Sequence, residues 1–503
     1  MSVPPEQAEV AAWLGRLAGA APVETHISLV FLGADTAWKL KKAVRLGFLD
    51  FTALADRHRF ALRELELNAP AAPGLYRDVV AVVRRADGTL GFGEGAEAGR
   101  PALDWVLRMA RVPAGDFLDR VVAAGRLDAA LADAVADAVA SYHAGCPQAA
   151  AGSDPARALT EVMRGNAAAA RAAGLPAAAV AAWEEAMAAV LVPLGPWLAA
   201  RAQAGFVRRA HGDLHLGNLC LWQGRPVPFD ALEFDEAMAT VDLGYDLAFL
   251  LMDLDRHAGR AWANRVMNRY VARTGDAALT RGLPAFLSQR AMVRAHVEAA
   301  RGHRAAADEY LAASLAYLRP APALVVAIGG LPGTGKSTLA RALAPDLGRA
   351  PGALVLRSDE IRKRQHGVAP EARLPQDAYA TAAGARVFAA LTAAAGEVAA
   401  GGQAVIGDAT FLDPAHRAAI AATAGAVPFL GLWLEAPLAA LEARVAARTA
   451  DASDATVAVL RAAAAGAEAP GAGWVRIDAT EAPAALAAAR AAIAGVAARD
   501  PTF

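Results

Sequence analysis

Alternating apolar and polar residues predict a small β-rich lobe near the start of the chain. Four short runs show this alternation, and a turn containing glycine follows the first and the third of them. They cover residues 27–32, 36–40, 79–83 and 90–92. Runs of this kind, separated by short polar turns, are typical of β-hairpins. We therefore predict two hairpins in this lobe.

Helical spacing of the apolar residues dominates the part of the chain that follows. From Leu103 to Ala202 an alanine-rich sequence repeats its apolar positions with a helical period, and residues 290–301 and 306–318 do the same. We therefore predict a helical lobe after the β-rich one. Its most apolar run, 187–200, contains two prolines and is shorter than the roughly 20 residues that cross a bilayer. We expect this run to be one or two buried helices.

The sequence Arg319-Pro320-Ala321-Pro322 ends this helical region, because proline cannot continue a helix and favours an extended connector. A chain of 503 residues is also too long for one hydrophobic core. An apolar strand at residues 324–328 follows the prolines. We therefore predict a first domain over residues 1–318, a linker over 319–323 and a second domain over 324–503.

The second domain opens with a phosphate-binding motif, G-x-x-x-x-G-K-S, directly after the apolar strand and before a helix predicted from Thr338. Glycines let backbone N–H groups converge on phosphate oxygens, the lysine spans the β and γ phosphates, and the serine hydroxyl ligates Mg²⁺. We therefore predict that ATP or GTP binds here with Mg²⁺. The residues predicted to bind the nucleotide are Gly330, Gly333, Gly335, Lys336, Ser337 and Thr338.

Two acidic residues follow later strands of this domain. Asp359 comes shortly after the apolar run 354–356, and Asp408 ends the run that begins at Val405. An aspartate with an arginine one helical turn later can orient an acceptor hydroxyl and clamp an anionic group. We therefore predict catalytic roles for Asp359 and Arg362. Asp408 is predicted to join Ser337 as a metal ligand.

This arrangement resembles the small P-loop kinases, including gluconate kinase and polynucleotide kinase. In kinases of this shape a lid helix places arginines over the transferring phosphoryl group, and the resemblance implies this catalytic role for Arg444 and Arg448. The alternative for both is a solvated helix face. The basic run 362–364 is interpreted as a clamp for a small anion, with a nucleic-acid patch as the alternative.

A second kind of phosphotransferase motif lies in the first domain, within residues 211–218. Asn218 follows Asp213 by five positions, the spacing of a protein-kinase catalytic loop, and Asp230 ends a short strand further on. Phosphoryl transfer needs a carboxylate to orient the attacking hydroxyl and oxygen ligands to hold Mg²⁺. We predict the first role for Asp213 and metal binding for Asn218 and Asp230.

With this motif, residues 1–318 resemble the aminoglycoside phosphotransferase and choline kinase group, and the whole chain resembles the bifunctional aminoglycoside phosphotransferase/ATP-binding proteins. In such kinases a helix glutamate holds a strand lysine against the phosphates. The resemblance implies that Lys41 and Glu64 have these roles, with Lys39 and Glu66 as alternatives. The expected fold class is α/β and α+β: a bilobal protein-kinase-like domain, followed by a P-loop kinase domain with a parallel sheet.

Three smaller expectations belong to the first domain. Asp246 is predicted to be a buried carboxylate that braces the catalytic loop, rather than a metal ligand. His215 is left with two interpretations, contact with a phosphate or a hydrogen bond to the backbone. Residues 27–34 contain Gly33 as their one glycine, so a looser lid replaces the glycine-rich loop of protein kinases.

Composition narrows the choice of partner and compartment. The formal net charge is −1, which does not favour a nucleic-acid partner. The two cysteines, Cys146 and Cys220, have no metal-ligand spacing, and Glu6 and Glu9 stand where a secretory signal needs basic residues. We therefore expect a cytoplasmic protein with a small-molecule hydroxyl substrate, no membrane segment and an undefined oligomeric state.

The leading hypothesis is a bifunctional ATP-dependent kinase acting on an aminoglycoside, an amino-sugar or a polyol. In the first alternative, one domain is a nucleotide-binding regulator of the other. In the second, the P-loop domain phosphorylates the 5′-hydroxyl of a polynucleotide.

Overall fold

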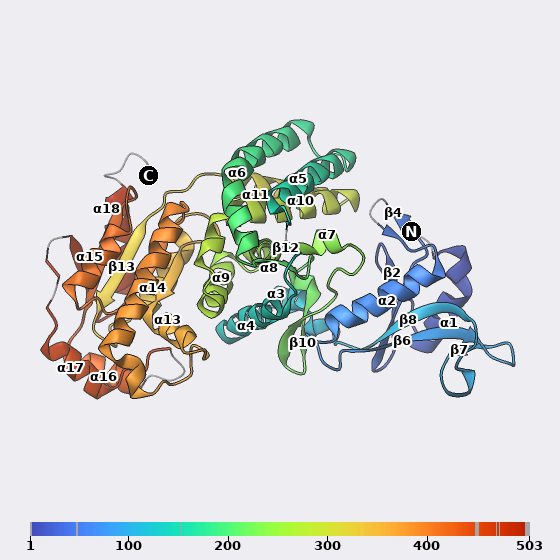
Figure 1. Ribbon diagram of the computed structural model, residues 1–503, viewed down its shortest axis with the longest axis horizontal. Helices are drawn as coiled ribbons and strands as arrows, with labels where there is room; N and C mark the ends of the chain where they lie inside the picture. Colours follow the sequence, from blue (N-terminus) through green and yellow to red (C-terminus); the bar gives the residue numbers. More distant parts are fainter. Residues whose placement is uncertain are drawn as a thin grey trace. The chain divides into compact units, whose positions relative to one another are not determined.

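The computed structural model describes residues 3–46, 49–150, 152–447, 452–468, 470–471 and 473–497 (Figure 1). The chain forms two compact units. The first comprises Met1–Pro155 and Ala200–Asp246, and the second comprises Ala156–Ala199 and Leu247–Phe503. Most of the helical region thus belongs to the same compact unit as the P-loop segment. The division into functional domains at residues 318 and 324 stays a prediction.

A six-stranded antiparallel sheet forms the core of the first unit, in the order β1-β2-β3-β8-β6-β7. Both predicted hairpins are present, as β2 with β3 and as β6 with β7. Apolar side chains of the sheet pack against α1 (Ala8–Ala18). The strands are β1 (Val23–Glu24), β2 (Ser28–Leu32), β3 (Thr36–Lys41), β6 (Tyr76–Arg84), β7 (Leu90–Phe92) and β8 (Ala102–Ala110).

The prediction of helix from Leu103 onward was wrong for its first residues, which form the strand β8. This strand is hydrogen-bonded to β3 on one side and to β6 on the other. Pairing on both edges satisfies its backbone groups. Its buried Asp104 also accepts hydrogen bonds from Gln7 and Arg57, at 2.7 and 2.9 Å. These long-range contacts outweigh a local pattern that is compatible with a helix.

The first unit also contains the motif of residues 211–218. The hairpin of β10 and β11 begins directly after Asn218 and ends two residues before Asp230. The two cysteines are free and buried, as predicted. The remaining elements are β4 (Arg45–Leu46), β5 (Leu49–Asp50), α2 (Leu54–Asn68), α3 (Leu118–Ala123), α4 (Ala129–Gly145), β9 (Val207–Arg209), β10 (Leu219–Trp222), β11 (Arg225–Pro228), α7 (Glu236–Ala239) and β12 (Thr240–Asp242).

Long helices make up the first part of the second unit. Two helices, α6 in this part and α14 (Thr381–Ala400) in the P-loop segment, are long and apolar enough to cross a membrane by length and composition. One face of each is buried in the protein, however, and Trp183 of α6 donates a hydrogen bond to Ser288 at 2.9 Å. The helices are α5 (Pro155–Ala172), α6 (Ala177–Gln203), α8 (Leu243–His257), α9 (Arg260–Thr274), α10 (Leu283–Ala300) and α11 (Arg304–Tyr317).

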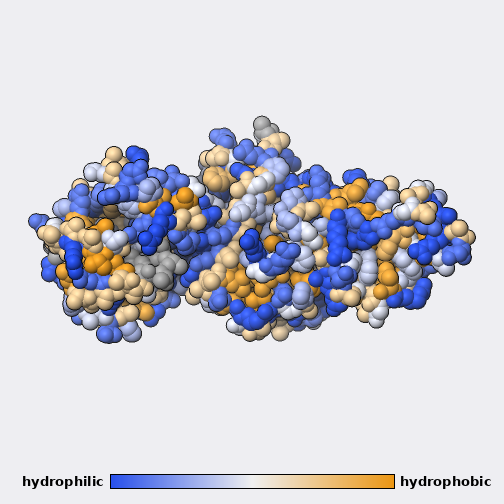
Figure 2. Space-filling model, turned by 90° about the horizontal axis from the view of Figure 1, so that it is seen from below, coloured by the Kyte–Doolittle hydropathy of each residue, from blue (hydrophilic) through white to orange (hydrophobic). Residues whose placement is uncertain are grey.

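Exposed apolar residues are spread over many elements. On the face shown in Figure 2, hydrophobic residues lie in small groups between hydrophilic ones. Large exposed hydrophobic residues come from both units, and they include Leu17, Leu62, Val192 and Leu438. Scattered exposure of this kind is ordinary for a protein surface.

A five-stranded parallel sheet, in the order β14-β15-β13-β16-β17, forms the core of the P-loop segment. Ile406 packs on the face covered by α12 and α18. A side chain at Gly407 would instead meet Leu391 and Ile420 of the helices α14 and α15. The sheet is therefore covered on both faces, as expected for a parallel sheet. Figure 1 shows β13 among these helices.

The elements of this segment confirm the predicted fold class. The strands are β13 (Val325–Gly330), β14 (Leu354–Arg357), β15 (Val405–Asp408), β16 (Phe429–Glu435) and β17 (Trp474–Asp478). The helices besides α14 are α12 (Lys336–Leu343), α13 (Ser358–Gln365), α15 (Pro414–Ala422), α16 (Leu438–Ala446), α17 (Val457–Ala465) and α18 (Ala482–Ala497).

Candidate active sites

Two lysines of β3 converge on one buried glutamate of α2. Lys39 and Lys41 are two positions apart, so their side chains point to the same face of the strand. Lys39 Nζ donates to Glu64 Oε1 at 2.7 Å, and Lys41 Nζ donates to Glu64 Oε2 at 2.8 Å. Burial by itself raises the pKa of Glu64, but the two ammonium groups reverse this and lower it to about 2. Glu64 therefore stays ionised and fixes both lysines.

The two lysines differ in their second partner. Lys39 Nζ also donates to Asp230 Oδ1 at 2.6 Å, and the Asp230 side chain is 40% exposed. Lys41 pairs instead with Glu233, where both side chains are buried. Sequence reasoning gave Lys41 the phosphate role, with Lys39 as the alternative. This geometry favours Lys39, because it is the lysine joined to the accessible carboxylate of the predicted metal site.

The glutamate alternative is less well placed, and one acidic residue was missed. The Glu66 side chain is 69% exposed and pairs with Arg63 on the outside of the same helix. Glu233, which balances the charge of Lys41, was not predicted. It follows Asp230 by three positions, and no spacing rule in the sequence identifies it.

The catalytic loop brings Asp213 and Asn218 together. Asn218 Nδ2 donates to the backbone oxygen of Asp213 at 2.9 Å and to its Oδ2 atom at 3.0 Å. The Asp213 side chain is 43% exposed, so a substrate hydroxyl can reach it. The backbone N–H of Phe229 donates to the Asn218 carbonyl at 3.0 Å. This bond ties the loop to the segment that carries Asp230.

Asp246 braces the catalytic loop through hydrogen bonds to its backbone, as predicted. Its carboxylate accepts the backbone N–H groups of His211 and Gly212, at 3.0 and 2.9 Å. His143 Nε2 lies 3.1 Å from the same carboxylate, and the side chains of Asp246 and His143 are buried. Asp246 therefore fixes the start of the loop through its main chain.

We expect Asp246→Ala to lower the free energy of unfolding by roughly 2–4 kcal/mol, because two backbone N–H groups lose their acceptor inside the protein. Urea unfolding followed by circular dichroism measures this loss. The matched control is Asp308→Ala, which changes an exposed aspartate of α11. Equal unfolding midpoints for the two variants would contradict the bracing role.

The histidines of the loop hold its backbone. His215 Nδ1 accepts the backbone N–H of Gly217 at 3.0 Å, which is the backbone role left open for it, and His215 Nε2 lies 3.5 Å from Asp213 Oδ2. His211 Nε2 lies 2.9 Å from the Phe229 carbonyl. Burial lowers the pKa of His211, so it is neutral near pH 7.

The donor set of this cluster fits Mg²⁺. Asp230 supplies a carboxylate and Asn218 an amide oxygen, and Asp230 has a φ of 61°, a conformation rare outside glycine that is common at functional sites. Within the described part of the chain, no group of three or more His, Cys, Asp or Glu side chains could hold a metal alone. Mg²⁺ in nucleotide sites is commonly held by one or two carboxylates together with the phosphates.

The backbone of the P-loop requires glycine at two positions. Gly330 and Gly333 have φ values of 133° and 89°, which disfavour any residue with a side chain. A Cβ atom at Gly330 would lie 2.5 Å from the Leu434 carbonyl, and one at Gly333 would lie 2.9 Å from the Leu441 carbonyl. These glycines therefore allow β13 to turn sharply into α12 beside neighbouring backbone.

Lys336 lies across this loop. Its Nζ atom donates to the carbonyls of Gly330 and Leu331, both at 2.9 Å. The helix α12 begins at Lys336 rather than at the predicted Thr338, because left-handed Gly335 already serves as its N-cap. Ser337 is half-buried and Thr338 is exposed, in the first turn of this helix.

The predicted acids lie at the carboxyl edge of the sheet near the P-loop. Asp408 is in register with Ile328 on one neighbouring strand and with Arg357 on the other, and Arg357 Nε donates to it at 3.2 Å. Asp359 is in the first turn of α13. Desolvation raises the pKa of Asp359, Arg357 opposes this, and the charge of Asp408 adds to it. A carboxylate with a raised pKa is a better proton acceptor than an ordinary aspartate.

The basic run after Asp359 has partners inside the protein. Arg362 donates to the Ala378 carbonyl at 2.8 Å and lies over the Tyr379 ring. Lys363 is fully buried against Asp454, and Arg364 donates to the Ala272 carbonyl at 3.1 Å. The anion-clamp role of Arg362 stays a prediction.

Of the two predicted lid arginines, Arg444 lies within the described residues. Arg444 donates to the carbonyls of Ala479 and Thr480, at 2.9 and 2.6 Å, next to the P-loop residue Gly333. Arg448 lies outside the described residues. The lid role of both stays a prediction.

Comparison with known proteins gives one family model and several relatives. The model described as an AAA domain matches residues 325–470, in agreement with the P-loop prediction. An uncharacterized protein of Mycobacterium tuberculosis, Rv2004c, is 30% identical over 370 residues, which are 68% of this chain and 67% of the relative.

Solved structures show weaker likeness. A gluconokinase from Sinorhizobium meliloti has a TM-score of 0.25 and 21% identity, over 36% of this chain and 94% of its own. A choline/ethanolamine kinase family protein from Mesorhizobium loti has a TM-score of 0.36 and 15% identity, over 62% of this chain and 95% of its own. The functional proposal therefore rests on the residues of the two clusters.

Proposed function

This chain belongs to the family of the mycobacterial protein Rv2004c, and we propose for it the function that its two clusters support, a bifunctional ATP-dependent small-molecule kinase. Both clusters carry the parts of a phosphotransferase with a hydroxyl acceptor. One observation carries the proposal. Asp213, hydrogen-bonded to Asn218 at 3.0 Å, and Asp230, hydrogen-bonded to Lys39 at 2.6 Å, are both accessible in one cluster of carboxylate, amide and ammonium groups, which supports this function.

In the first cluster, Asp213 orients the acceptor hydroxyl and accepts its proton as the new bond to phosphorus forms. Lys39, held by Glu64, faces the nucleotide phosphates. Asn218 and Asp230 would hold Mg²⁺, which neutralises the charge of the phosphates when bound. The transfer is direct, because the nearby histidines hold the backbone and supply no nucleophile.

In the second cluster, the P-loop backbone and Lys336 hold the phosphates of a second nucleotide. Ser337 and Asp408 would bind its Mg²⁺. Asp359 is the proposed base, and its raised pKa supports this role. Arg362, Arg444 and Arg448 are proposed to act on the anionic groups as the site closes.

The proposed acceptors are an aminoglycoside, an amino-sugar or another polyol for the first site and a related small hydroxyl compound for the second. The basic run 362–364 supports a small acceptor over a polynucleotide, because all three side chains contact groups inside the protein. We propose a cytoplasmic location, in keeping with the use of ATP.

The test is γ-phosphate transfer from ATP to panels of aminoglycosides, amino-sugars, polyols and 5′-hydroxyl oligonucleotides. We expect small hydroxyl compounds to be labelled by both sites. Labelling of oligonucleotides alone would overturn the small-molecule proposal. Transfer that depends on the first site alone would favour a regulatory P-loop segment.

The two β3 lysines give a sharper prediction. We expect Lys39→Met to lower kcat/KM of the first site by at least about 100-fold, because it removes the phosphate-facing charge. Its effect on stability should be the smaller of the two, because buried Glu64 keeps Lys41 as a partner. Lys41→Met should instead lower the free energy of unfolding by about 3–5 kcal/mol, because buried Glu233 loses its partner.

Each lysine variant is the control for the other, measured by steady-state kinetics and by urea unfolding. If Lys41→Met abolished transfer at unchanged stability while Lys39→Met stayed active, the phosphate role would belong to Lys41.

A further inference from the structure

A basic pocket of about 500 Å³ lies within the second unit, apart from the P-loop residues. Its walls come from the end of α8, the start of α9, the end of α11, the connector at residues 319–321 and the loop at residues 348–350. Four arginines line it, and one carboxylate faces them. They are Arg256, Arg260, Arg319, Arg349 and Asp255.

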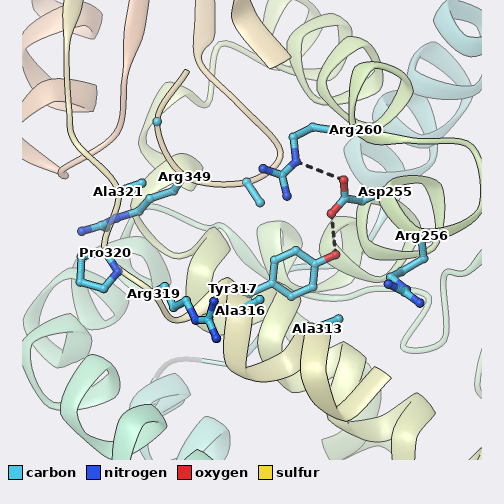
Figure 3. A pocket seen from close by; sticks show the side chains of 12 residues that line it. Asp255, Arg256, Arg260, Ala313, Ala316, Tyr317, Arg319, Pro320, Ala321 and Arg349 are labelled. Atoms are coloured by element: carbon cyan, nitrogen blue, oxygen red, sulfur yellow. Dashed lines mark hydrogen bonds and ion pairs between the residues drawn. The ribbon is translucent and has the colours of Figure 1, made fainter. Parts of the chain in front are cut away.

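Two of the arginines are already neutralised. Arg256 pairs with Glu309 at 2.6 Å, and Arg260 lies 3.3 Å from Asp255. Tyr317 also donates its hydroxyl hydrogen to Asp255, at 2.7 Å. Figure 3 shows Tyr317 and Arg260 both directed at Asp255. This side of the pocket is therefore a fixed polar wall.

The other two arginines lack such neutralisation. In the described part of the chain, no carboxylate pairs with Arg319 or with Arg349. Burial lowers the pKa of the Arg349 guanidinium, which means that its charge is poorly solvated. An anion bound in the pocket would restore the favourable interactions that this charge has lost.

The backbone of Arg349 is held in place. Gln403, itself buried, accepts the N–H of Arg349 at 2.8 Å and donates to its carbonyl at 2.9 Å. A Cβ atom at Gly402 would lie 3.1 Å from Arg349 Nη2, so the arginine side chain passes directly over that glycine. The glycine thus leaves room for the guanidinium at the end of α14.

We propose that this pocket binds the phosphate group of a small phosphorylated molecule, at a site separate from both nucleotide clusters. Two guanidinium groups without carboxylate partners match the two negative charges of a phosphomonoester, and their planar donors suit its oxygens. The volume accepts a molecule of metabolite size.

Such a ligand would contact segments that lead into the strands β13 and β14 of the P-loop cluster. The connector leads directly into β13, and the loop at 348–350 precedes β14, which ends beside Asp359. The helix α9 also holds β14 through Asn268, which accepts the backbone N–H of Val355 at 2.6 Å. The ligand would thus contact the connector, the start of α9 and the loop before β14 at once.

The test is calorimetric titration with pyrophosphate while a non-hydrolysable ATP analogue and Mg²⁺ saturate the nucleotide clusters. We expect binding, and the double variant Arg319→Gln/Arg349→Gln should weaken it by at least about tenfold. The matched control is Arg386→Gln, which changes an exposed arginine of α14 and should leave the affinity unchanged. Malonate, a dicarboxylate, should bind more weakly than pyrophosphate.

Retained binding of the ATP analogue by the double variant shows that it is folded, and Arg349→Lys should recover part of the affinity. The analogue stays present in every titration, because pyrophosphate would otherwise also enter the nucleotide clusters. Equal pyrophosphate affinities for the wild type and the double variant, or no binding to either, would overturn the proposal.

Discussion

Lys336→Ala should lower phosphoryl transfer at the P-loop cluster by at least about 100-fold, the effect of removing one well-placed charge from a developing anion. Lys336 is the one ammonium group that the loop carries, and it already lies over the carbonyls of Gly330 and Leu331. Transfer to acceptors of the first cluster should be unchanged. The measurement is ATP-dependent labelling of each acceptor class, with kcat determined separately for each.

The matched control for this variant is Arg386→Ala, which removes an exposed cation from α14. It should keep full activity at both clusters. If Lys336→Ala kept wild-type kcat for every acceptor that the protein uses, the P-loop cluster would have no transferase role.

Asp213→Asn should lower kcat of the first cluster by about 10²–10⁴-fold, the range for loss of a general base. The change keeps the shape of the side chain. The hydrogen bond from Asn218 to the backbone oxygen of residue 213 does not depend on the carboxylate. Affinity for a non-hydrolysable ATP analogue should therefore stay near the wild-type value, so that the loss is confined to the chemical step.

The comparison variant is Asp119→Asn, which changes a partly exposed aspartate of α3 in the same unit. It should leave kcat unaltered. A wild-type kcat for Asp213→Asn, or an equal loss in both variants, would remove Asp213 from the reaction.

Local sequence signals predicted much of the fold. The hairpins of β2 with β3 and of β6 with β7 combine alternation with short polar turns, and the P-loop follows its strand without a gap. The strand β8 was missed, because its place between β3 and β6 is set by pairing with residues far away in the sequence. No local pattern records such partners.

The sites were predictable to the extent that their residues share a spacing rule. Asp213 and Asn218 were found from their separation, and the structure brings them into contact. The sequence prediction gave the phosphate role to Lys41, whereas the geometry favours Lys39. Both lysines lie on one strand face, and they differ only in the second acid that each one contacts, Asp230 or Glu233. Glu233 and its partner Lys41 come from distant segments, and only the folded chain brings them together. The arginines of the basic pocket also come from separate segments.

We propose that one chain carries two independent nucleotide sites, each beside its own carboxylate. The stoichiometry with which a non-hydrolysable ATP analogue binds in the presence of Mg²⁺ decides whether it does. We predict two molecules per chain, one of which is lost in Lys336→Ala and the other in Lys39→Met/Asp230→Ala. A stoichiometry of one, abolished by only one of these variants, would mean that the chain has a single nucleotide site.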